Sequence, residues 1–263
     1  KYLSGKDFGE NISLALRMST IDSDGYRKEH GSSQGGIFFG LEHRGEMIKN
    51  QFRAIIGSEN TQLAWDGIAK ADIDNLEKRR TGNKAYTDDF LQQIYSLNST
   101  AKFNENFSFR NVSYLVLGKG YYEVFKQDQD YYTYNLDIKN IYDDQVELSR
   151  KTDLLRRKWI DNNYYGIVPM LTYSNSDVRF DIGGEFRMYK GNHFGEVTQF
   201  SDSQLSAQYS SNWHRYYQYL GKKNILTGFA RVLWSPINQP FAVSIDLQNQ
   251  NIHWDLNQDK IGH

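Results

Sequence analysis

The chain has no cysteine among its 263 residues. This absence excludes disulfides, thiolate metal sites and a cysteine nucleophile. The chain also has no run approaching the roughly 18 apolar residues that a membrane-spanning helix needs, and its mean hydropathy is −0.71. A transmembrane β-strand would leave no such run, because every second residue of the strand faces away from lipid.

The chain also has no large excess of positive or negative charge. The formal net charge is −1 and the pI ≈ 6.7, so the composition gives no reason to expect a nucleic-acid partner. Aromatic side chains are abundant instead, at 15% of the residues, with 19 Tyr and 15 Phe. Because aromatic residues are enriched in strands, the composition favours an all-β fold.

The clearest pattern in the chain lies in Val178–Tyr189, where apolar and polar residues alternate. A period of two predicts a strand with one apolar face and one wet face. The strand Arg156–Tyr173 precedes it, and the polar residues 174–177 suit a tight turn between the two. Pro169 cannot donate to a strand ladder, so we expect a bulge or a local break there.

The same alternation predicts further strands along the chain. They are Asn11–Thr20, Gly35–Arg44, Met47–Ser58, Asp89–Phe103, Asn106–Gly118, Asn224–Trp234 and Phe241–Gln250, with another beginning near Asn251. Four loops are predicted at 21–33, 59–88, 119–155 and 190–219, the second with a short helix within Ala69–Arg80.

The connections between these strands alternate in length. Short turns are expected near residues 44, 104, 175 and 237, and long loops near residues 26, 74, 137 and 205. Outer-membrane barrels have this arrangement, with short periplasmic turns and long extracellular loops. Aromatic residues also flank the short turns, as a membrane interface favours: Phe103, Phe107, Tyr173, Trp234 and Phe241. A soluble β-sandwich stays open as the alternative, because period-two alternation serves either architecture.

No catalytic constellation is visible. The six histidines are scattered without a metal-ligand pair, and no serine has the setting of a nucleophile elbow. The segment Asp22–Gly25 resembles the start of a calcium loop but lacks the distal glutamate. The sequence therefore predicts neither an enzyme nor a metal or cofactor site.

Five segments in order resemble TonB-dependent outer-membrane receptors, especially those of the Bacteroidetes type. Leu155–Gly166 is similar to their "RRKWLDNDFYG" stretch, and Gly183–Val197 is similar to "GG…YxGxHFGxV". The other three are Ser23–Arg27, Ala64–Gly67 followed by Arg80–Asn83, and Gly118–Glu123. The resemblance covers about residues 12–250.

The resemblance implies an antiparallel transmembrane β-barrel of 22 strands with a plugged lumen, of which residues 1–263 would supply about ten strands. The plug and the remaining strands would lie outside this sequence. The implied function is TonB-dependent uptake of a scarce bulky ligand, such as a siderophore, cobalamin, haem or glycan, across the outer membrane of a Gram-negative bacterium. The implied partners are the lipid bilayer and, through the plug, the TonB complex.

Candidate site residues are of two kinds. Rigid amphipathic side chains suit ligand capture, and the expected ligand contacts are Trp65, Tyr121, Tyr122, Tyr131, Tyr132, Trp159, His193, Trp213 and Tyr216. Charged residues expected on the lumen wall, facing the plug, are Arg179, Asp181, Glu185 and Arg187. The aromatic residues could instead pack the loops or form an outer aromatic belt. Two further functions stay open: a barrel subunit of an outer-membrane assembly, and a soluble carbohydrate-binding β-sandwich.

Overall fold

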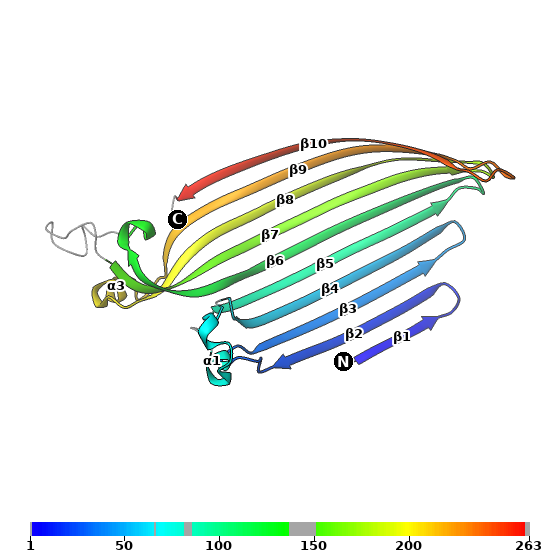
Figure 1. Cartoon of the computed structure of the whole chain (residues 1–263). Coiled ribbons are helices and arrows are strands. Elements are labelled where there is room, and N and C mark those ends of the chain that lie inside the picture. Colours follow the sequence, from blue (N-terminus) through cyan, green and yellow to red (C-terminus); the bar gives the residue numbers. More distant parts are fainter. Residues whose placement is uncertain (1, 66, 82–85, 137–150, 261–263) are drawn as a thin grey trace.

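The computed structural model describes residues 2–65, 67–81, 86–136 and 151–260. They form a ten-stranded antiparallel sheet in which every strand pairs with its neighbours in sequence (Figure 1). The strands are β1 Tyr2–Phe8, β2 Ile12–Ser23, β3 Ser32–Arg44, β4 Ile48–Leu63, β5 Tyr86–Lys102, β6 Phe107–Asp130, β7 Lys151–Ser174, β8 Val178–Phe200, β9 His214–Trp234 and β10 Val243–Lys260. The sheet is open, with β1 and β10 at its two edges. The all-β prediction is confirmed.

The two ends of the sheet differ as predicted. Short turns join the strands at one end, and longer connections lie at the other end together with the helices (Figure 1). The helical segments are the 3-10 turn η1 Lys70–Asp72, α1 Leu76–Arg80, the 3-10 turn η2 Tyr131–Tyr134 and α3 Ser203–Gln208. We call these the turn end and the loop end. The loop expected near residue 137 lies largely outside the described residues.

Two predicted loops are in large part strand, and their prediction was wrong. Within 119–155, β6 continues to Asp130 and β7 begins at Lys151. Within 190–219, β8 continues to Phe200 and β9 begins at His214. Polar and aromatic residues occupy both faces in these parts, so the alternation that identifies a strand is lost. The short strand β1 also has no counterpart among the predicted elements.

The short helix predicted within Ala69–Arg80 is present as α1. Asn75 precedes its first turn, and the Asn75 side chain accepts a hydrogen bond of 3.1 Å from the Lys78 amide. Asparagine is a favoured N-cap because it satisfies one of the free amides of the first turn. The first half of the predicted segment forms η1 instead.

Pro169 causes a break in pairing without a bulge. The β7–β8 partners run to Ile167 opposite Phe186 and resume at Met170 opposite Gly183, with the register unchanged. On its other side Pro169 stays in register with Asn111 of β6. The expected local break is therefore confirmed, and the bulge is absent.

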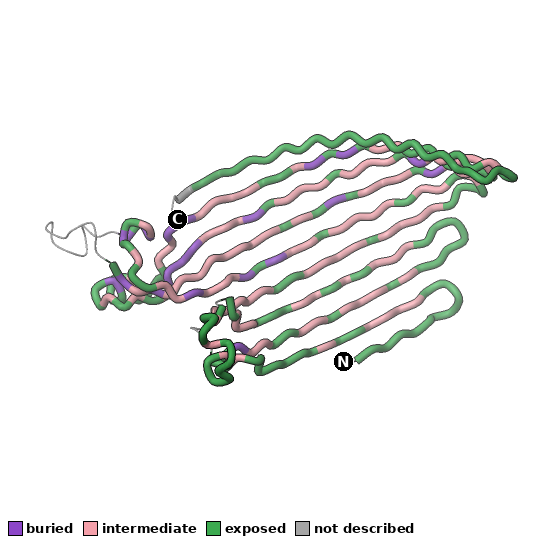
Figure 2. Tube along the Cα trace, in the orientation of Figure 1, coloured by how far each residue is buried: buried purple, intermediate pink, exposed green. Residues whose placement is uncertain are grey.

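The buried hydrophobic cluster lies at the loop end of the sheet (Figure 2). Its members are Tyr131, Tyr134, Leu136, Leu154, Val197, Leu205, Tyr216 and Tyr217. Single buried residues such as Asp181 and Thr227 also lie in the wall. Among the described residues no second sheet packs on the first. A β-sandwich needs two sheets packed face to face, so the described residues do not favour the soluble β-sandwich alternative.

Gly166 provides a test of packing within the wall. A Cβ at this position would lie 2.5 Å from the Tyr114 hydroxyl and 3.0 Å from the Phe186 carbonyl oxygen. We expect Gly166→Ala to destabilise the full-length protein by about 1–3 kcal/mol, because the ring must move aside. Equilibrium unfolding in urea measures this difference.

Gly221→Ala is the matched control for that substitution. A Cβ there would meet nothing nearer than the Gly191 carbonyl oxygen at 3.9 Å, and an alanine in a strand is favoured over glycine by roughly 0.5–1 kcal/mol. We expect it to be neutral or stabilising. Equal losses in both variants would show that the close approach of Tyr114 is not what requires Gly166.

Candidate functional site

The register divides the sheet into two faces of opposite character. Directly paired residues on neighbouring strands share a face, and successive residues alternate between faces. Ile182 on β8 therefore shares a face with Leu171 on β7 and Ala230 on β9. We call this side the apolar face and the side that carries Asp181 the polar face. Other large side chains of the apolar face are Leu14, Leu16, Met18, Ile37, Phe39, Leu41, Phe52, Ile56, Leu97, Phe109, Leu115, Ile167, Phe180, Phe186, Leu226, Val232, Ile245 and Leu247.

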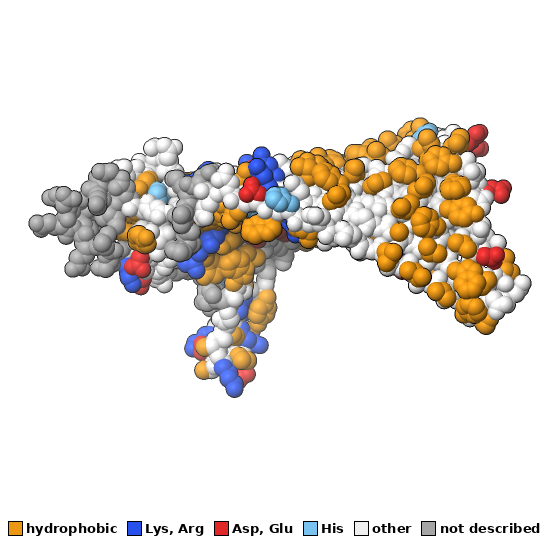
Figure 3. Space-filling view, turned by 90° about the horizontal axis from the view of Figure 1, so that it is seen from above, with side chains coloured by type: hydrophobic (Ala, Val, Ile, Leu, Met, Phe, Trp, Pro, Cys, Tyr) orange, Lys and Arg blue, Asp and Glu red, His pale blue; other side chains and the backbone are white. Residues whose placement is uncertain are grey.

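The apolar face forms a continuous band in the half near the turn end. Figure 3 shows hydrophobic side chains gathered over this half of the sheet. On β8 the band runs from Val178 to Met188, and from β2 to β10 its described residues include no Asp, Glu, Lys or Arg. Charges begin beyond it, where Lys119 and Asp161 form an ion pair of 3.7 Å. The apolar rows Val178–Met188 on β8 and Ile12–Met18 on β2, which carry no charge, both lie in this band.

Aromatic residues border this band at the turn end. The rings of Phe107 and Tyr173 lie 4.9 Å apart, and those of Trp234 and Phe241 lie 5.7 Å apart. Phe103 is also exposed there, with 55% of its surface accessible. These are the positions that the sequence assigned to an interfacial belt.

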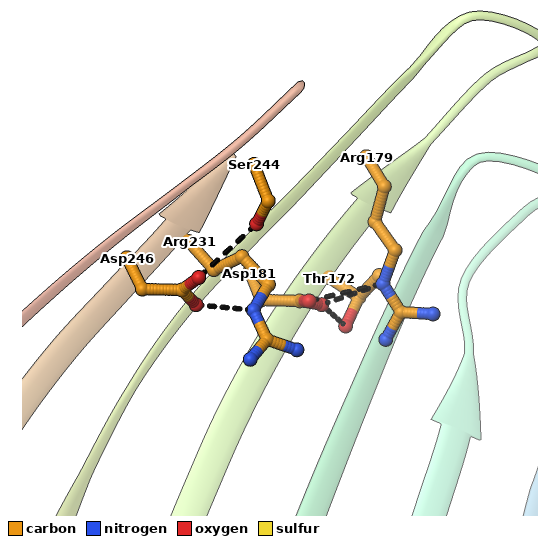
Figure 4. A network of polar contacts seen from close by, with 6 residues as sticks. All are labelled: Thr172, Arg179, Asp181, Arg231, Ser244 and Asp246. Carbon is orange, nitrogen blue, oxygen red and sulfur yellow. Dashed lines mark hydrogen bonds and ion pairs between the residues drawn. The ribbon is translucent and has the colours of Figure 1, made fainter. Parts of the chain in front are cut away.

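The four predicted wall residues all lie on the polar face. Asp181 is only 3% exposed, and its carboxylate accepts hydrogen bonds from Arg179 Nε at 2.9 Å and Thr172 Oγ1 at 2.6 Å (Figure 4). Arg187 Nε pairs with Glu185 Oε1 at 3.0 Å. Beside them Arg231 forms an ion pair with Asp246 (Figure 4). This part of the wall therefore neutralises its own charges.

The predicted ligand residues Trp65 and Tyr122 come together at the loop end of the polar face. Their rings lie 5.3 Å apart, and Trp65 also stacks on Tyr86 at 5.5 Å. His193 of β8 lies on the same face. Its ring stacks on the ring of Tyr219 with centroids 4.7 Å apart, and its Nε2 lies 3.3 Å from the Tyr189 hydroxyl.

Three other predicted ligand residues lie on the opposite, apolar face. Tyr121 and Trp159 are directly paired, with ring centroids 4.5 Å apart. The Arg157 guanidinium lies 4.1 Å from the Tyr121 ring and 4.7 Å from the ring of Trp213. Arg157 also forms an ion pair of 2.6 Å with Glu123. These aromatic residues lie on the apolar face beyond the Lys119–Asp161 ion pair, as an aromatic belt would. Tyr122 lies on the other face of the sheet.

The remaining three predicted ligand residues belong to the loop end. Tyr131 and Tyr216 are fully buried, and the Tyr131 hydroxyl donates a hydrogen bond of 2.8 Å to Asp202. A ligand could reach these two rings only after rearrangement of the core. Tyr132 is 76% exposed. The ligand role of the nine aromatic and histidine residues stays a prediction.

The predicted ligand contacts do not include Tyr86, Tyr189 and Tyr219, although these residues contact Trp65 and His193 on the polar face. Tyr164 was missed as well, and its hydroxyl accepts a hydrogen bond of 3.1 Å from Arg187. Each lies an even number of positions from a polar-face residue on its own strand, so a correct register would have found them.

Nothing in the described part of the chain suggests metal chemistry or a helical membrane anchor. No group of three or more His, Asp or Glu side chains there is placed to hold a metal ion. The helices in these ranges are all too short or too polar to cross a bilayer.

Comparison with known proteins gives a result only at the level of structure. No protein-family model matches the chain, and no curated protein matches its sequence. The ferric preacinetobactin receptor BauA from Acinetobacter baumannii is similar over 97% of this chain and 39% of its own, with a TM-score of 0.66 and 10% identity. The ferric-catecholate import receptor Fiu from E. coli K12 is similar in its closed form (TM-score 0.58, 10% identity, 97% of this chain and 45% of its own). Its open form gives a TM-score of 0.59 and 11% identity over 97% of this chain and 48% of its own.

The chain has the fold of part of a β-barrel like those of the three structures just compared. It spans less than half the length of each of the three chains just compared. At this identity the likeness concerns the fold alone. The predicted fold class of about ten strands from a larger barrel agrees with it.

Proposed function

We propose that this chain is part of the wall of an outer-membrane β-barrel that imports a scarce small ligand by TonB-dependent transport. The observation that carries the proposal is the division of the sheet near the turn end into an apolar band without charge from β2 to β10 and a polar face that carries ion pairs. The fold of ferric-siderophore receptors supports the same reading.

The dimensions of the apolar band fit a bilayer. A transmembrane β-strand needs about 9–11 residues when tilted. On β8 the band extends from Val178 to Met188 before Lys190 ends it, which is a stretch of that length. The opposite face carries charged side chains, with ion pairs on β8 to β10, as a polar lumen allows.

An open sheet cannot stand alone in lipid. The unpaired backbone groups of β1 and β10 would each cost several kcal/mol in hydrocarbon. We therefore propose that further strands close the barrel, up to the 22 that the family resemblance implies. A plug that links the lumen to the TonB complex belongs to the same proposal, as does the Bacteroidetes origin.

Within this proposal the ligand meets the loop end of the polar face. Tyr122 with Trp65, and His193 with Tyr219, place flat side chains on the lumen side at the end where loops extend. Such rings bind planar or sugar-like groups with little loss of side-chain entropy. No catalytic arrangement is part of the proposal, and no observation favours an assembly subunit over a transporter.

The proposal is tested by uptake in cells that produce the full-length protein. We expect accumulation of at least one of four labelled probes: a ferric catecholate, cobalamin, haem or a glycan. A protonophore is expected to abolish it, because TonB-dependent uptake is energised. Failure of all four probes would contradict the proposal.

Once a probe is found, its binding distinguishes the predicted ligand residues on the polar face from those on the apolar face. We expect Tyr122→Ala and His193→Ala to weaken binding of that probe up to about tenfold each, because one ring contact is worth roughly 0.5–1.5 kcal/mol. Tyr121→Ala removes the same side-chain type on the apolar face, and Trp159→Ala removes another ring there; both serve as controls. Weaker binding in the controls alone would reverse the assignment of the faces.

A further inference from the structure

The apolar face changes character part-way along β10. The side chains that β10 places on this face are, in order, Val243, Ile245, Leu247, Asn249, Asn251 and His253. A tilted transmembrane strand needs about 9–11 residues, and the apolar part from Val243 to Leu247 covers about half of that length. On β8 the same face stays free of polar side chains as far as Met188. β10 therefore becomes polar within the length that lipid would cover.

The other face of β10 shows the reverse change. Ile252, Trp254 and Leu256 lie on the polar face of the sheet, and 69% of the Trp254 surface is exposed. The pairing of β10 with β9 keeps its register from Val243 to Gln258, so no bulge exchanges the two faces. The loop half of β10 is thus inverted relative to the other strands of the wall.

The neighbouring strand β9 extends the polar region. Asn224 pairs directly with His253 and lies on the same face. Gly228 pairs with Asn249, and a Cβ on Gly228 would meet no atom within 4 Å, so another protein surface can approach closely there. We call Asn224, Asn249, Asn251 and His253 the outer polar patch. Within the described ranges none of these four side chains has a hydrogen-bond partner.

Lipid is an unfavourable neighbour for the outer polar patch. An amide or imidazole group in hydrocarbon loses the hydrogen bonds that it makes in water. Polar side chains at membrane depth therefore almost always face protein or a water-filled cavity. A further strand at the free edge of β10 would pair with its backbone and leave both faces of β10 uncovered. The patch therefore needs protein on the outer side of the wall.

Charges of both signs border the patch on its loop-end side. Lys190 of β8, Lys222 of β9 and Asp255 of β10 lie in one row, each paired with the next. In the part of the chain that the structure describes, none of the three forms an ion pair, although like charges placed directly opposite, as in Lys190 and Lys222, are destabilising.

Such a surface is complementary to a second copy of itself. A twofold axis can bring the lysines of one copy opposite the aspartate of the other, as in an isologous interface. An asparagine side chain both donates and accepts hydrogen bonds, so the amides of two copies can satisfy each other. A partner with the same patch therefore meets both the charge and the hydrogen-bond requirements.

We propose that the outer polar patch is the interface through which two copies of this protein associate side by side in the membrane. The proposal goes beyond uptake and rests on one part of the proposed function, namely that the apolar face meets lipid. It does not depend on the ligand, so it can fail while uptake is retained.

Crosslinking through a single introduced cysteine tests the proposal in the full-length protein, freed of any other cysteine and kept in its own membrane. With a bifunctional maleimide, we expect Asn251→Cys to give a product of twice the mass of the full-length protein. Leu97→Cys is the matched control, because Leu97 lies in the same row and on the same face but five strands away on β5. We expect no crosslinked product from it.

Reversal of the bordering charges distinguishes a second copy from a different protein. Asp255→Lys leaves only cations in the row, and we expect it to reduce the yield of crosslinked Asn251→Cys. Addition of Lys190→Glu and Lys222→Glu reverses every sign, which keeps the surface complementary to itself, so the yield should be restored. Loss of the product in both variants, or a product of any other mass, would overturn the proposal in favour of a different protein.

Quenching by brominated lipid separates this proposal from the assignment of the lipid side. A fluorophore on Asn251→Cys should be quenched less than one on Leu97→Cys. Equal strong quenching at both positions, without a crosslinked product, would mean that lipid covers the patch and would overturn only this proposal. Weak quenching at both positions would contradict the lipid side itself and the proposed function with it.

Discussion

Ile167→Arg is expected to destabilise the full-length protein in lipid vesicles by about 2–4 kcal/mol. Ile167 lies on the apolar face with 46% of its surface exposed. It is six residues from Tyr173, which lies at the aromatic border, and so it falls near the middle of the band. An arginine at the midplane of a barrel's lipid face has a cost of that size. Equilibrium unfolding in denaturant measures it.

Val168→Arg is the matched control, because it places the same charge one residue away on the polar face. Position 168 lies beside the row of Glu185, whose carboxylate can face the new guanidinium. We expect a change below about 1 kcal/mol, as for other partly exposed ion pairs. Equal costs at both positions would mean that both faces meet the same medium, contrary to a lipid side and a lumen side.

Tyr134→Ala is expected to unfold the loop-end core while the wall stays folded. Tyr134 is fully buried and its ring packs on Tyr216 at 4.7 Å. Its hydroxyl donates to Gln129 at 3.2 Å and accepts from Arg156 at 3.0 Å, and burial raises the pKa of this hydroxyl. Removal of a buried aromatic ring costs about 3–5 kcal/mol. Hydrogen exchange should show lost protection in α3 and η2.

Tyr132→Ala tests the specificity of that result from within the same 3-10 turn. Tyr132 is 76% exposed, so we expect no measurable change in hydrogen exchange. If both substitutions released α3 and η2 equally, the backbone of the turn and not the buried ring would hold the core. If neither did, the core would contribute little to the order of the loop end.

The half of the sheet near the turn end could be predicted from sequence because one of its faces is apolar and the other is polar. The alternation in Val178–Tyr189 reflects an apolar side and a polar side of one strand, and the structure places Arg179 and Asp181 on the polar side as predicted. Because the strands form a meander, successive connections lie at opposite ends of the sheet, so the alternation of short and long connections separates the turn end from the loop end.

The loop half of the strands could not be predicted in this way. Beyond Lys119 and Lys190 both faces carry polar and aromatic groups, so no period of two marks β6 or β8 there. Tyrosine, glycine and aspartate in these stretches are typical of loops as well as strands. Backbone pairing with long neighbouring strands holds them extended, and a local pattern does not record that pairing.

The candidate site depended on register, which one sequence does not fix. Tyr121 and Tyr122 are adjacent, yet Tyr121 packs on Trp159 of the apolar face and Tyr122 on Trp65 of the polar face. A slip of one residue exchanges the faces of a whole strand. The sequence identifies both residues as tyrosines but does not show which face of the sheet each one occupies. Both were therefore predicted as ligand contacts.

Quenching by lipid tests the central claim most directly. Because the chain has no cysteine, a thiol-reactive fluorophore can be placed by Tyr95→Cys, Ser96→Cys, Leu97→Cys or Asn98→Cys, one at a time, in the full-length protein. The proteins are then inserted into vesicles of brominated lipid. Strong quenching at 95 and 97 and weak quenching at 96 and 98 is the expected result, since the first two positions lie on the apolar face. Equal quenching at all four positions, or the reverse pattern, would contradict a wall with lipid on one side and a lumen on the other.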